Sequence, residues 1–331
     1  MILLSFGTRP EWIKIKPLIE EMENKIPYKL LFTGQHEDLL SQVKNNENLL
    51  KLKIKDGSNR LDSIVSSIMN CEKIFENIDY VLVQGDTTSA FSIALAAFHR
   101  RIKVIHLEAG LRTYDKNQPY PEEFNRQAIS RIADIHLCPT ESSKQFLLEE
   151  KVQGSKYVVG NTVLDNLNNI ETKFTNKVIV TMHRRENHLL MSQWFLEINN
   201  LAIKNPDLNF ILPLHPNPNV KKHKDILANI DVVDPLKYED FLSLLSESKF
   251  VITDSGGLQE EASFFGKKCI VCREKTERIE GINTFSYICK EPSKLESIFN
   301  HVNSNYIPGG TCPYGDGQAS KKIVRILSSE L

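Results

Sequence analysis

The chain has no long apolar run and no excess of charge of either sign. A membrane-spanning helix needs about 18 or more consecutive apolar residues, and the N-terminus has neither the basic lead nor the apolar core of a signal peptide. The 41 Lys and Arg residues nearly balance the 42 Asp and Glu residues, so the net charge is -1. We therefore expect a cytoplasmic protein with no membrane partner and no nucleic acid partner, which binds any anion locally.

Several short motifs are also missing. The sequence contains no GxSxG, no GxxxxGK(S/T), no GxGxxG and no metal-ligand spacing, which argues against a serine hydrolase, a P-loop, a dinucleotide fingerprint and a metal site. Six cysteines are scattered, and the one CxxC, Cys269 to Cys272, falls within a predicted strand. Residues i and i+3 of a strand point to opposite faces, so buried free thiols are the better prediction.

What the chain does contain is a regular alternation of short apolar strands and longer amphipathic helices, which is typical of an α/β fold. The 331 residues are 41% hydrophobic, enough for two cores. Between two series of strands, residues 166–177 are polar and Asn-rich and read as a linker. The expected strands are residues 2–5, 29–32, 80–83, 104–107, 135–138, 157–159, 178–181, 209–213, 232–233, 250–253 and 269–272.

This pattern predicts two doubly wound, Rossmann-like domains, residues 1–168 and 177–314, with a ligand in the cleft that they face. The final segment, 315–331, predicts a capped helix that could complete the first domain, although the sequence alone does not show where it docks. In such sheets the ligand-binding loops follow the carboxyl ends of the strands.

The loop from Asp254 to Glu261 is the most informative of these loops. Ser255, Gly256 and Gly257 follow an apolar strand and precede good helix formers. Without Cβ atoms at the two glycines, a phosphate can approach the unpaired N–H groups of the first turn, where the helix dipole favours an anion. Glu261, one turn further on, could reach ribose hydroxyls. An ordinary glycine-rich turn is the alternative.

Other loops after strands are rich in charge. Arg9 precedes Pro10, a residue suited to the start of a helix, and Lys14 lies one turn later. Asp86 and Glu108 follow the strands at 80–83 and 104–107. Arg9 and Lys14 could instead be solvated charges.

Two further groups of charged residues could have either a functional or a purely structural role. Glu122 and Glu123 begin a helix that is marked by Pro121, and acidic residues of a first turn are common partners of the helix dipole. In the second half, His183 with Arg184 and Arg185 follows a strand and forms a plausible diphosphate-binding group.

Taken together and in order, these segments resemble the non-hydrolysing UDP-N-acetylglucosamine 2-epimerases, which have the two-domain GT-B architecture. The resemblance covers nearly the whole chain, and its ordered set of motifs is far more specific than any one of them. The matching segments are FGTRPE at 6–11, GQH at 34–36, GDTT at 85–88, EAGLRT at 108–113, PEE at 121–123, GNT at 160–162, HRREN at 183–187, HPNPNV at 215–220, DSGGLQEE at 254–261, TER at 276–278 and PYGDG at 313–317.

The resemblance implies inversion of C2 of a UDP-2-acetamido sugar by anti-elimination of UDP and re-addition of UDP. It implies that Asp86, Glu108 and Glu122 are the catalytic carboxylates, and which of them takes the proton stays open. It further implies the following roles: His183 and Lys14 assist near the leaving diphosphate, Arg9, His183, Ser255, Gly256 and Gly257 bind the diphosphate, Glu261 binds the ribose and Arg278 lies near the nucleotide. No metal or other cofactor, a homodimer, a cytoplasmic location and a role in surface-polysaccharide (capsule) synthesis are implied as well.

The sequence also departs from the family pattern. Glu37 stands where an Arg is usual and Asn59–Arg60 replace a usual Gln, so activation by a second UDP-sugar is doubtful. Phe285 replaces a usual Gly and Ile279 a usual Pro, which motivates the hypothesis that the substrate is a modified 2-acetamido sugar nucleotide. Three different functions also stay open, namely a hydrolysing 2-epimerase, a GT-B glycosyltransferase and a catalytically silent nucleotide-sugar sensor.

Overall fold

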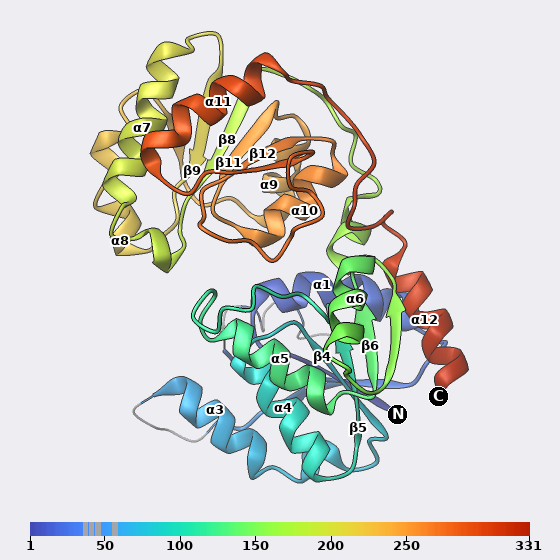
Figure 1. Cartoon of the computed structure of the whole chain (residues 1–331). Coiled ribbons are helices and arrows are strands. Elements are labelled where there is room, and N and C mark those ends of the chain that lie inside the picture. The colour runs from blue at the N-terminus through green and yellow to red at the C-terminus, as the bar shows by residue number, and fades with distance from the viewer. Residues whose placement is uncertain (36–38, 40–42, 44–47, 55–58) are drawn as a thin grey trace. The chain divides into compact units, whose positions relative to one another are not determined.

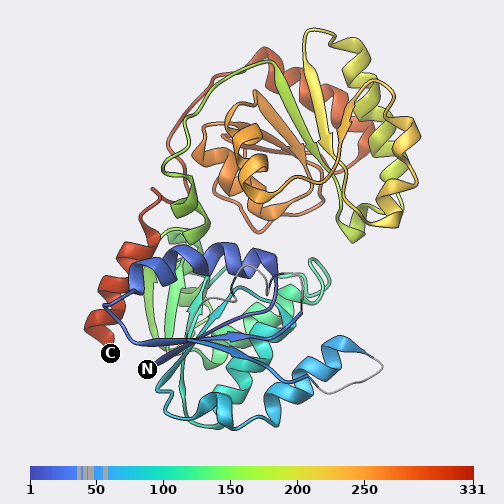
Figure 2. The same ribbon diagram turned by 180° about the vertical axis from the view of Figure 1, so that it is seen from behind.

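The structure is a computed structural model that describes residues 1–35, 39, 43, 48–54 and 59–331. The chain divides into two compact units, each built around one parallel sheet (Figures 1 and 2). Unit 1 comprises Met1–Asn166 and Gly315–Leu331, and unit 2 comprises Leu167–Tyr314. Within the described residues, no helix has both the length and the apolar character that a membrane span requires.

Unit 1 contains a seven-stranded parallel sheet of order β3-β2-β1-β4-β5-β6-β7. Its strands are β1 (Ile2–Phe6), β2 (Tyr28–Phe32), β3 (Leu49–Lys51), β4 (Tyr80–Gln84), β5 (Lys103–Leu107), β6 (Ile135–Cys138) and β7 (Ser155–Val158). Its helices are α1 (Arg9–Met22), α3 (Arg60–Met69), α4 (Thr88–His99), α5 (Glu122–Ile132), α6 (Glu141–Glu149) and α12 (Ala319–Glu330).

Alternate residues of the strands of unit 1 face two separate cores, as expected of a sheet covered on both sides. Leu4 and Ile105 pack with α1 and α12, whereas Leu3 and Val104 pack with α3, α4 and α5. Figures 1 and 2 show these two groups of helices on opposite faces of the sheet.

The last helix, α12, packs against α1 within unit 1. The carboxylate of Asp165 accepts hydrogen bonds from the N–H groups of Ala319 (3.0 Å) and Ser320 (2.7 Å). A negative charge at these first-turn N–H groups caps the helix. The docking site that the sequence did not reveal is therefore the α1 face of the first sheet.

Unit 2 contains a six-stranded parallel sheet of order β10-β9-β8-β11-β12-β13, with α7 and α11 on one face and α9 and α10 on the other (Figures 1 and 2). Its strands are β8 (Lys177–Thr181), β9 (Asn209–Pro213), β10 (Asp231–Val233), β11 (Phe250–Thr253), β12 (Lys268–Val271) and β13 (Ser286–Ile288). Its helices are α7 (Met191–Lys204), α8 (Pro218–Lys221), α9 (Tyr238–Ser246), α10 (Gly256–Phe264) and α11 (Leu295–Ser304).

The predicted α/β class is confirmed, and each of the expected strands is present with its ends shifted by at most two residues. Two strands, β3 and β13, were not predicted. Both have three residues and lie at the edge of a sheet, where partial burial removes the apolar run that marks a central strand. The six cysteines are free thiols, and burial raises the pKa of Cys138 and of Cys289 to about 12.

Candidate active site

The loop after β1 is fixed by Glu11, a buried carboxylate at the start of α1. Its Oε2 accepts hydrogen bonds from the N–H groups of Gly7 (2.9 Å) and Thr8 (2.7 Å), which completes a capping box with the Thr8 side chain. Its Oε1 accepts a hydrogen bond from the Thr87 hydroxyl at the start of α4 (2.7 Å). Burial nevertheless raises the pKa of Glu11. This network presents the exposed Arg9 on the first turn of α1.

Glu108 lies directly after β5 with a φ of 65°, in the left-handed region that a residue with a side chain rarely occupies. Both of its carboxylate oxygens lie 2.6 Å from Nζ of Lys14 on α1. The side chains of Gln84, at the end of β4, and Asn161 (3.0 Å) also donate to it. Strand ends distant in sequence thus converge on one ion pair, whose side chains are 13% (Lys14) and 7% (Glu108) exposed.

His106, two residues before Glu108, fixes the neighbouring loop. Its Nε2 lies 2.9 Å from the carbonyl oxygen of Gly85, which has a φ of 66°. Burial lowers the pKa of His106 to about 3, so the imidazole is neutral near pH 7 and Nε2–H donates to the carbonyl. The left-handed turn at Gly85 then presents Asp86, the next residue.

Asp86 is paired with Arg126 of α5, and Asn125 donates to the Asp86 carbonyl oxygen (2.8 Å). Arg126 also contacts the buried Glu123 (3.3 Å). Glu123 accepts hydrogen bonds from the N–H groups that follow the EAGLR segment, those of residues 113 (3.1 Å) and 114 (3.0 Å). Of the two acids that begin α5, Glu123 is therefore a buried structural anchor, whereas Glu122 is only partly buried.

In unit 2 the loops after β8 and β11 are held together by Asp254, whose side chain is fully buried. Its carboxylate accepts hydrogen bonds from the N–H groups of His183 (3.0 Å) and Arg184 (2.9 Å) and from Asn187 Nδ2 (3.1 Å). His183 Nδ1 lies 3.4 Å from Asp254 Oδ1, and the ring stacks on His215 with a centroid distance of 5.2 Å. Burial lowers the pKa of His183 although Asp254 acts in the opposite direction, which favours a neutral imidazole near pH 7.

The segment after β11 begins α10 at Gly256, as the sequence predicts. The Ser255 side chain makes no capping hydrogen bond, which leaves first-turn N–H groups available to an anion. A Cβ at Gly256 would lie 2.9 Å from the Glu277 carboxylate and 3.1 Å from the Arg278 guanidinium, whereas a Cβ at Gly257 would meet nothing within 4 Å. Packing therefore explains Gly256, and it does not explain Gly257.

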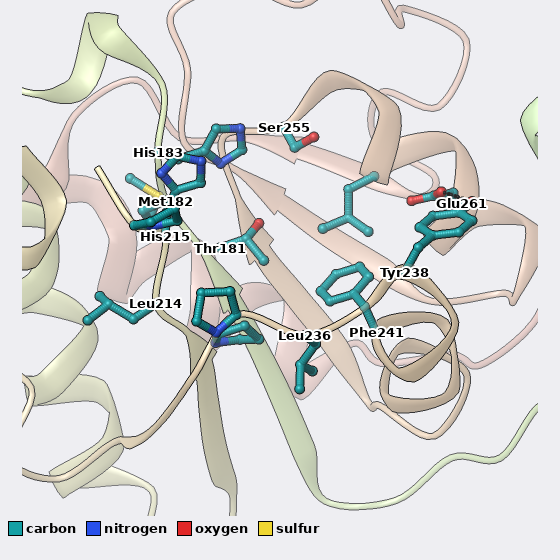
Figure 3. A pocket seen from close by; sticks show the side chains of 14 residues that line it. Thr181, Met182, His183, Leu214, His215, Leu236, Tyr238, Phe241, Ser255 and Glu261 are labelled. Carbon is teal, nitrogen blue, oxygen red and sulfur yellow. Dashed lines mark hydrogen bonds between the residues drawn. The ribbon is translucent and has the colours of Figure 1, made fainter. Parts of the chain in front are cut away.

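A pocket of about 290 Å³ opens beside this helix start within unit 2 (Figure 3). Apolar groups form most of its wall, with His183 and Ser255 at one side and Glu261 with Tyr238 at the other. The lining residues are Thr181, Met182, His183, Pro213, Leu214, His215, Pro216, Pro235, Leu236, Tyr238, Phe241, Ser255, Leu258 and Glu261. Apolar walls with a few polar groups are typical of a small-ligand site.

Two predicted residues lie elsewhere in unit 2. Arg278 is buried behind Gly256 and contacts Glu260 (3.2 Å) and Glu277, so its closeness to a nucleotide stays a prediction. Phe285 is buried under Gly310, with Nζ of Lys268 4.6 Å from the ring centroid. Because the Phe285 ring does not line the pocket, it gives no support to an altered substrate.

The predicted second-site residues are only partly described. His36 and Glu37 lie outside the described residues, and the Arg60 guanidinium donates to the carbonyl oxygen of Gly34. Among the residues that the structure describes, no cluster of three or more His, Cys, Asp or Glu side chains could hold a metal ion.

The structure joins Lys14 with Glu108 in unit 1, and His183, Ser255 and Glu261 around one pocket in unit 2. Sequence reasoning missed the side chains that hold these groups, namely Glu11, Gln84, His106, Asn125, Arg126, Asn161, Tyr238 and Asp254. Several of them lie inside the recognised motifs, and that position was the one signal available.

Comparisons with known proteins agree with this geometry. A family model described as UDP-N-acetylglucosamine 2-epimerase matches residues 20–328. A UDP-N-acetylglucosamine 2-epimerase of Campylobacter jejuni is 39% identical over an alignment covering 98% of this chain and 97% of that protein.

Two solved structures extend the likeness to three dimensions. The UDP-GlcNAc 2-epimerase of Neisseria meningitidis bound to UDP-GlcNAc has 36% identity and a TM-score of 0.89, covering 99% of both chains. The Methanocaldococcus jannaschii UDP-GlcNAc 2-epimerase, in complex with UDP-GlcNAc and UDP, has 28% identity and a TM-score of 0.81, also covering 99% of both chains. The predicted family and its GT-B fold are thereby confirmed, and the chain belongs to the UDP-N-acetylglucosamine 2-epimerase family.

Proposed function

We propose that this enzyme interconverts UDP-N-acetylglucosamine and UDP-N-acetylmannosamine without net hydrolysis. The observations that support the proposal are the ion-paired carboxylates of Asp86 and Glu108 after β4 and β5 in unit 1, and a helix start without a side-chain cap beside a largely apolar pocket in unit 2. The division of labour between units 1 and 2 is part of the proposal.

In the first step a base takes the C2 proton while the C1–O bond to the diphosphate breaks. The electron pair of the C–H bond forms the C1=C2 double bond of a 2-acetamidoglucal, and the electron pair of the C1–O bond leaves with UDP. In the second step a UDP oxygen adds back to C1 and a proton returns to the opposite face of C2. A base and an acid are therefore needed, each typically contributing about 10²–10⁴-fold in rate.

Asp86, Glu108 and Glu122 are the proposed carboxylates for these proton transfers. Lys14 holds the Glu108 carboxylate by both oxygens, which favours its ionised form. Arg126 forms an ion pair with Asp86. Fixed ion pairs of this kind keep the acids in place without reorganisation during the reaction.

Unit 2, together with Arg9 of unit 1, would hold the leaving group. Arg9, His183, Ser255, Gly256 and Gly257 are the proposed diphosphate ligands, with Glu261 on the ribose and Arg278 near the nucleotide. His183, whose backbone N–H donates to Asp254, lines the pocket together with Ser255 and would contact the diphosphate through its ring. Preorganised donors and the helix start stabilise the negative charge that develops on departing UDP.

Proton NMR in D2O with UDP-N-acetylglucosamine tests the proposal. We expect UDP-N-acetylmannosamine to appear with deuterium at C2 of both sugars. Free N-acetylmannosamine with UDP would instead indicate a hydrolysing enzyme, and UDP release only after addition of an acceptor would indicate a glycosyltransferase. Binding without exchange at C2 would indicate a silent sensor. A modified 2-acetamido substrate would be favoured only if such a sugar nucleotide reacted faster than the plain one.

Three finer proposals rest on the family alone. We propose that the enzyme works in the cytoplasm as a homodimer and that it supplies a sugar nucleotide for surface-polysaccharide synthesis. Sedimentation equilibrium of the purified chain measures the oligomeric state, and a monomer at working concentration would contradict the dimer.

A further inference from the structure

Tyr238 and Glu261 form a hydrogen-bonded pair on the wall of the nucleotide pocket. Tyr238 is the first residue of α9 and Glu261 lies on α10. The Tyr238 hydroxyl donates to Oε1 of Glu261 at 2.7 Å, and Figure 3 shows the two side chains next to each other at one side of the pocket.

The surroundings of Glu261 explain why such a donor matters. Glu261 is 7% exposed, and Leu236, Phe241 and Leu258 form the neighbouring wall of the pocket. A carboxylate in these surroundings loses hydration, and it needs a hydrogen-bond donor to keep its charge and its orientation. Burial, followed by the adjacent Glu261 carboxylate, raises the pKa of the Tyr238 phenol above its ordinary value. The phenol thus keeps its proton and acts towards Glu261 as a donor only.

The position of Glu261 on α10 relates it to the diphosphate. Glu261 lies five residues after Gly256, which is about 7.5 Å along an α-helix. A nucleoside diphosphate whose phosphates lie against the start of α10 would extend its ribose along the helix, towards Glu261. The vicinal ribose hydroxyls are donors that suit a carboxylate acceptor.

We propose that Tyr238 is a positioning residue that holds Glu261 for the 2′- and 3′-hydroxyls of the ribose and so gives the pocket its preference for ribonucleotides over 2′-deoxyribonucleotides. The inference rests on the proposed function, because it takes the nucleoside diphosphate part of the substrate as the occupant of the pocket. It adds a residue that makes the pocket select ribose over 2′-deoxyribose in the bound nucleotide.

Isothermal titration calorimetry of UDP and of 2′-deoxy-UDP tests this inference. Wild type should bind UDP more tightly than 2′-deoxy-UDP. The isosteric change Tyr238→Phe should weaken UDP binding about tenfold, the scale of a hydrogen bond to a charged group, and weaken 2′-deoxy-UDP much less. The ratio of the two dissociation constants should therefore shrink.

Phe241→Leu is the matched control, since Phe241 lies on the same helix and lines the same pocket without a polar group. This change removes apolar contact and should weaken both ligands by a similar factor, so the ratio stays as in wild type. Circular dichroism of both variants checks that they are folded.

Steady-state kinetics gives a second readout. The ribose is remote from C2 of the sugar, so Tyr238→Phe should raise KM for UDP-N-acetylglucosamine more than it lowers kcat. A variant that merely loosened the fold would weaken the binding of UDP and of 2′-deoxy-UDP alike.

The possible outcomes separate the inference from the proposed function. A Tyr238→Phe ratio equal to that of wild type would overturn the inference, as would a wild type that binds both ligands equally, even if the enzyme epimerises its substrate. A folded wild type that binds neither ligand would overturn the proposed function together with the inference. A reduced ratio in Tyr238→Phe, with an unchanged ratio in Phe241→Leu, would support it.

Discussion

An alanine at position 257 is expected to stabilise the enzyme and to weaken its binding of UDP. Gly257 lies in the first turn of α10, its φ is not in the left-handed region, and an added Cβ would face open space. Replacing a helical glycine that has an ordinary φ by alanine stabilises a protein by about 0.4–1 kcal/mol. If Gly257 were only part of a turn, the Gly257→Ala variant would be at least as stable as wild type and would keep its affinity for UDP.

The diphosphate gives the opposite expectation for binding. The open space at Gly257 is where a phosphate would approach the first-turn N–H groups, and a methyl group there would push it away. Hydrogen bonds to a charged group are worth about 1.5–3 kcal/mol each, so the loss of one should raise the dissociation constant of UDP by at least about tenfold.

Gly256→Ala is the matched comparison. Its Cβ would lie 2.9 Å from the Glu277 carboxylate and 3.1 Å from the Arg278 guanidinium, and overpacking of this kind costs about 1–3 kcal/mol. Both variants should bind UDP poorly, while urea unfolding should show higher stability for Gly257→Ala and lower stability for Gly256→Ala. A Gly257→Ala enzyme with wild-type affinity for UDP would refute the phosphate-binding role of this helix start.

Three further expectations concern unit 1. Lys14→Met should lower kcat by about 10²-fold or more and destabilise the fold by up to about 3 kcal/mol, because Glu108 stays buried without its cation; wild-type kcat would contradict this. Asp86→Asn should abolish C2 deuterium exchange with the fold intact, whereas Glu123→Gln should mainly lower stability, by about 1–3 kcal/mol. If Glu123→Gln abolished deuterium incorporation and Asp86→Asn only lowered the free energy of urea unfolding, the roles assigned to these two residues would be wrong. His106 has a folded pKa of about 3, below its unfolded value of about 6.5, so its contribution to stability is complete above the unfolded value and is lost by about 1.4 kcal/mol per pH unit as the pH falls towards the folded value. When the free energy of urea unfolding is measured at neutral and mildly acidic pH, its dependence on pH should be weaker for His106→Gln than for wild type. An equal pH dependence would rule out this contribution of His106.

The sequence predicts the fold well because each central strand is a short apolar run buried on both faces of its sheet. It also predicts that functional groups follow the strands, since parallel strands end at one edge of the sheet. What it does not predict is which groups pair. Lys14 and Glu108 are 94 residues apart and Asp86 and Arg126 are 40 apart, and no local pattern joins residues at such separations.

The same limit explains why the acids at the start of α5 were hard to separate. Glu122 and Glu123 are adjacent and both suit a first helical turn. Their roles differ because helical neighbours point about 100° apart, so Glu123 faces the loop N–H groups and Arg126 while Glu122 does not share those contacts. The direction that a helix face takes is set by packing of α5 against α4, which is a property of the folded chain.

The backbone at Glu108 indicates that this edge of the first sheet is built around a carboxylate. A non-glycine residue in the left-handed region costs about 1–3 kcal/mol, and Glu108 has a φ of 65°. Glycine would remove that strain, and Gly85 and Gly110 occupy the same region of φ nearby. A turn alone would therefore favour glycine at position 108. The side chain instead receives hydrogen bonds from Lys14, Gln84 and Asn161, whose combined interactions offset the strain. Since three separate segments supply those donors, the position is explained by a requirement for a carboxylate held in one orientation, which agrees with the proposed role of Glu108 in proton transfer at C2.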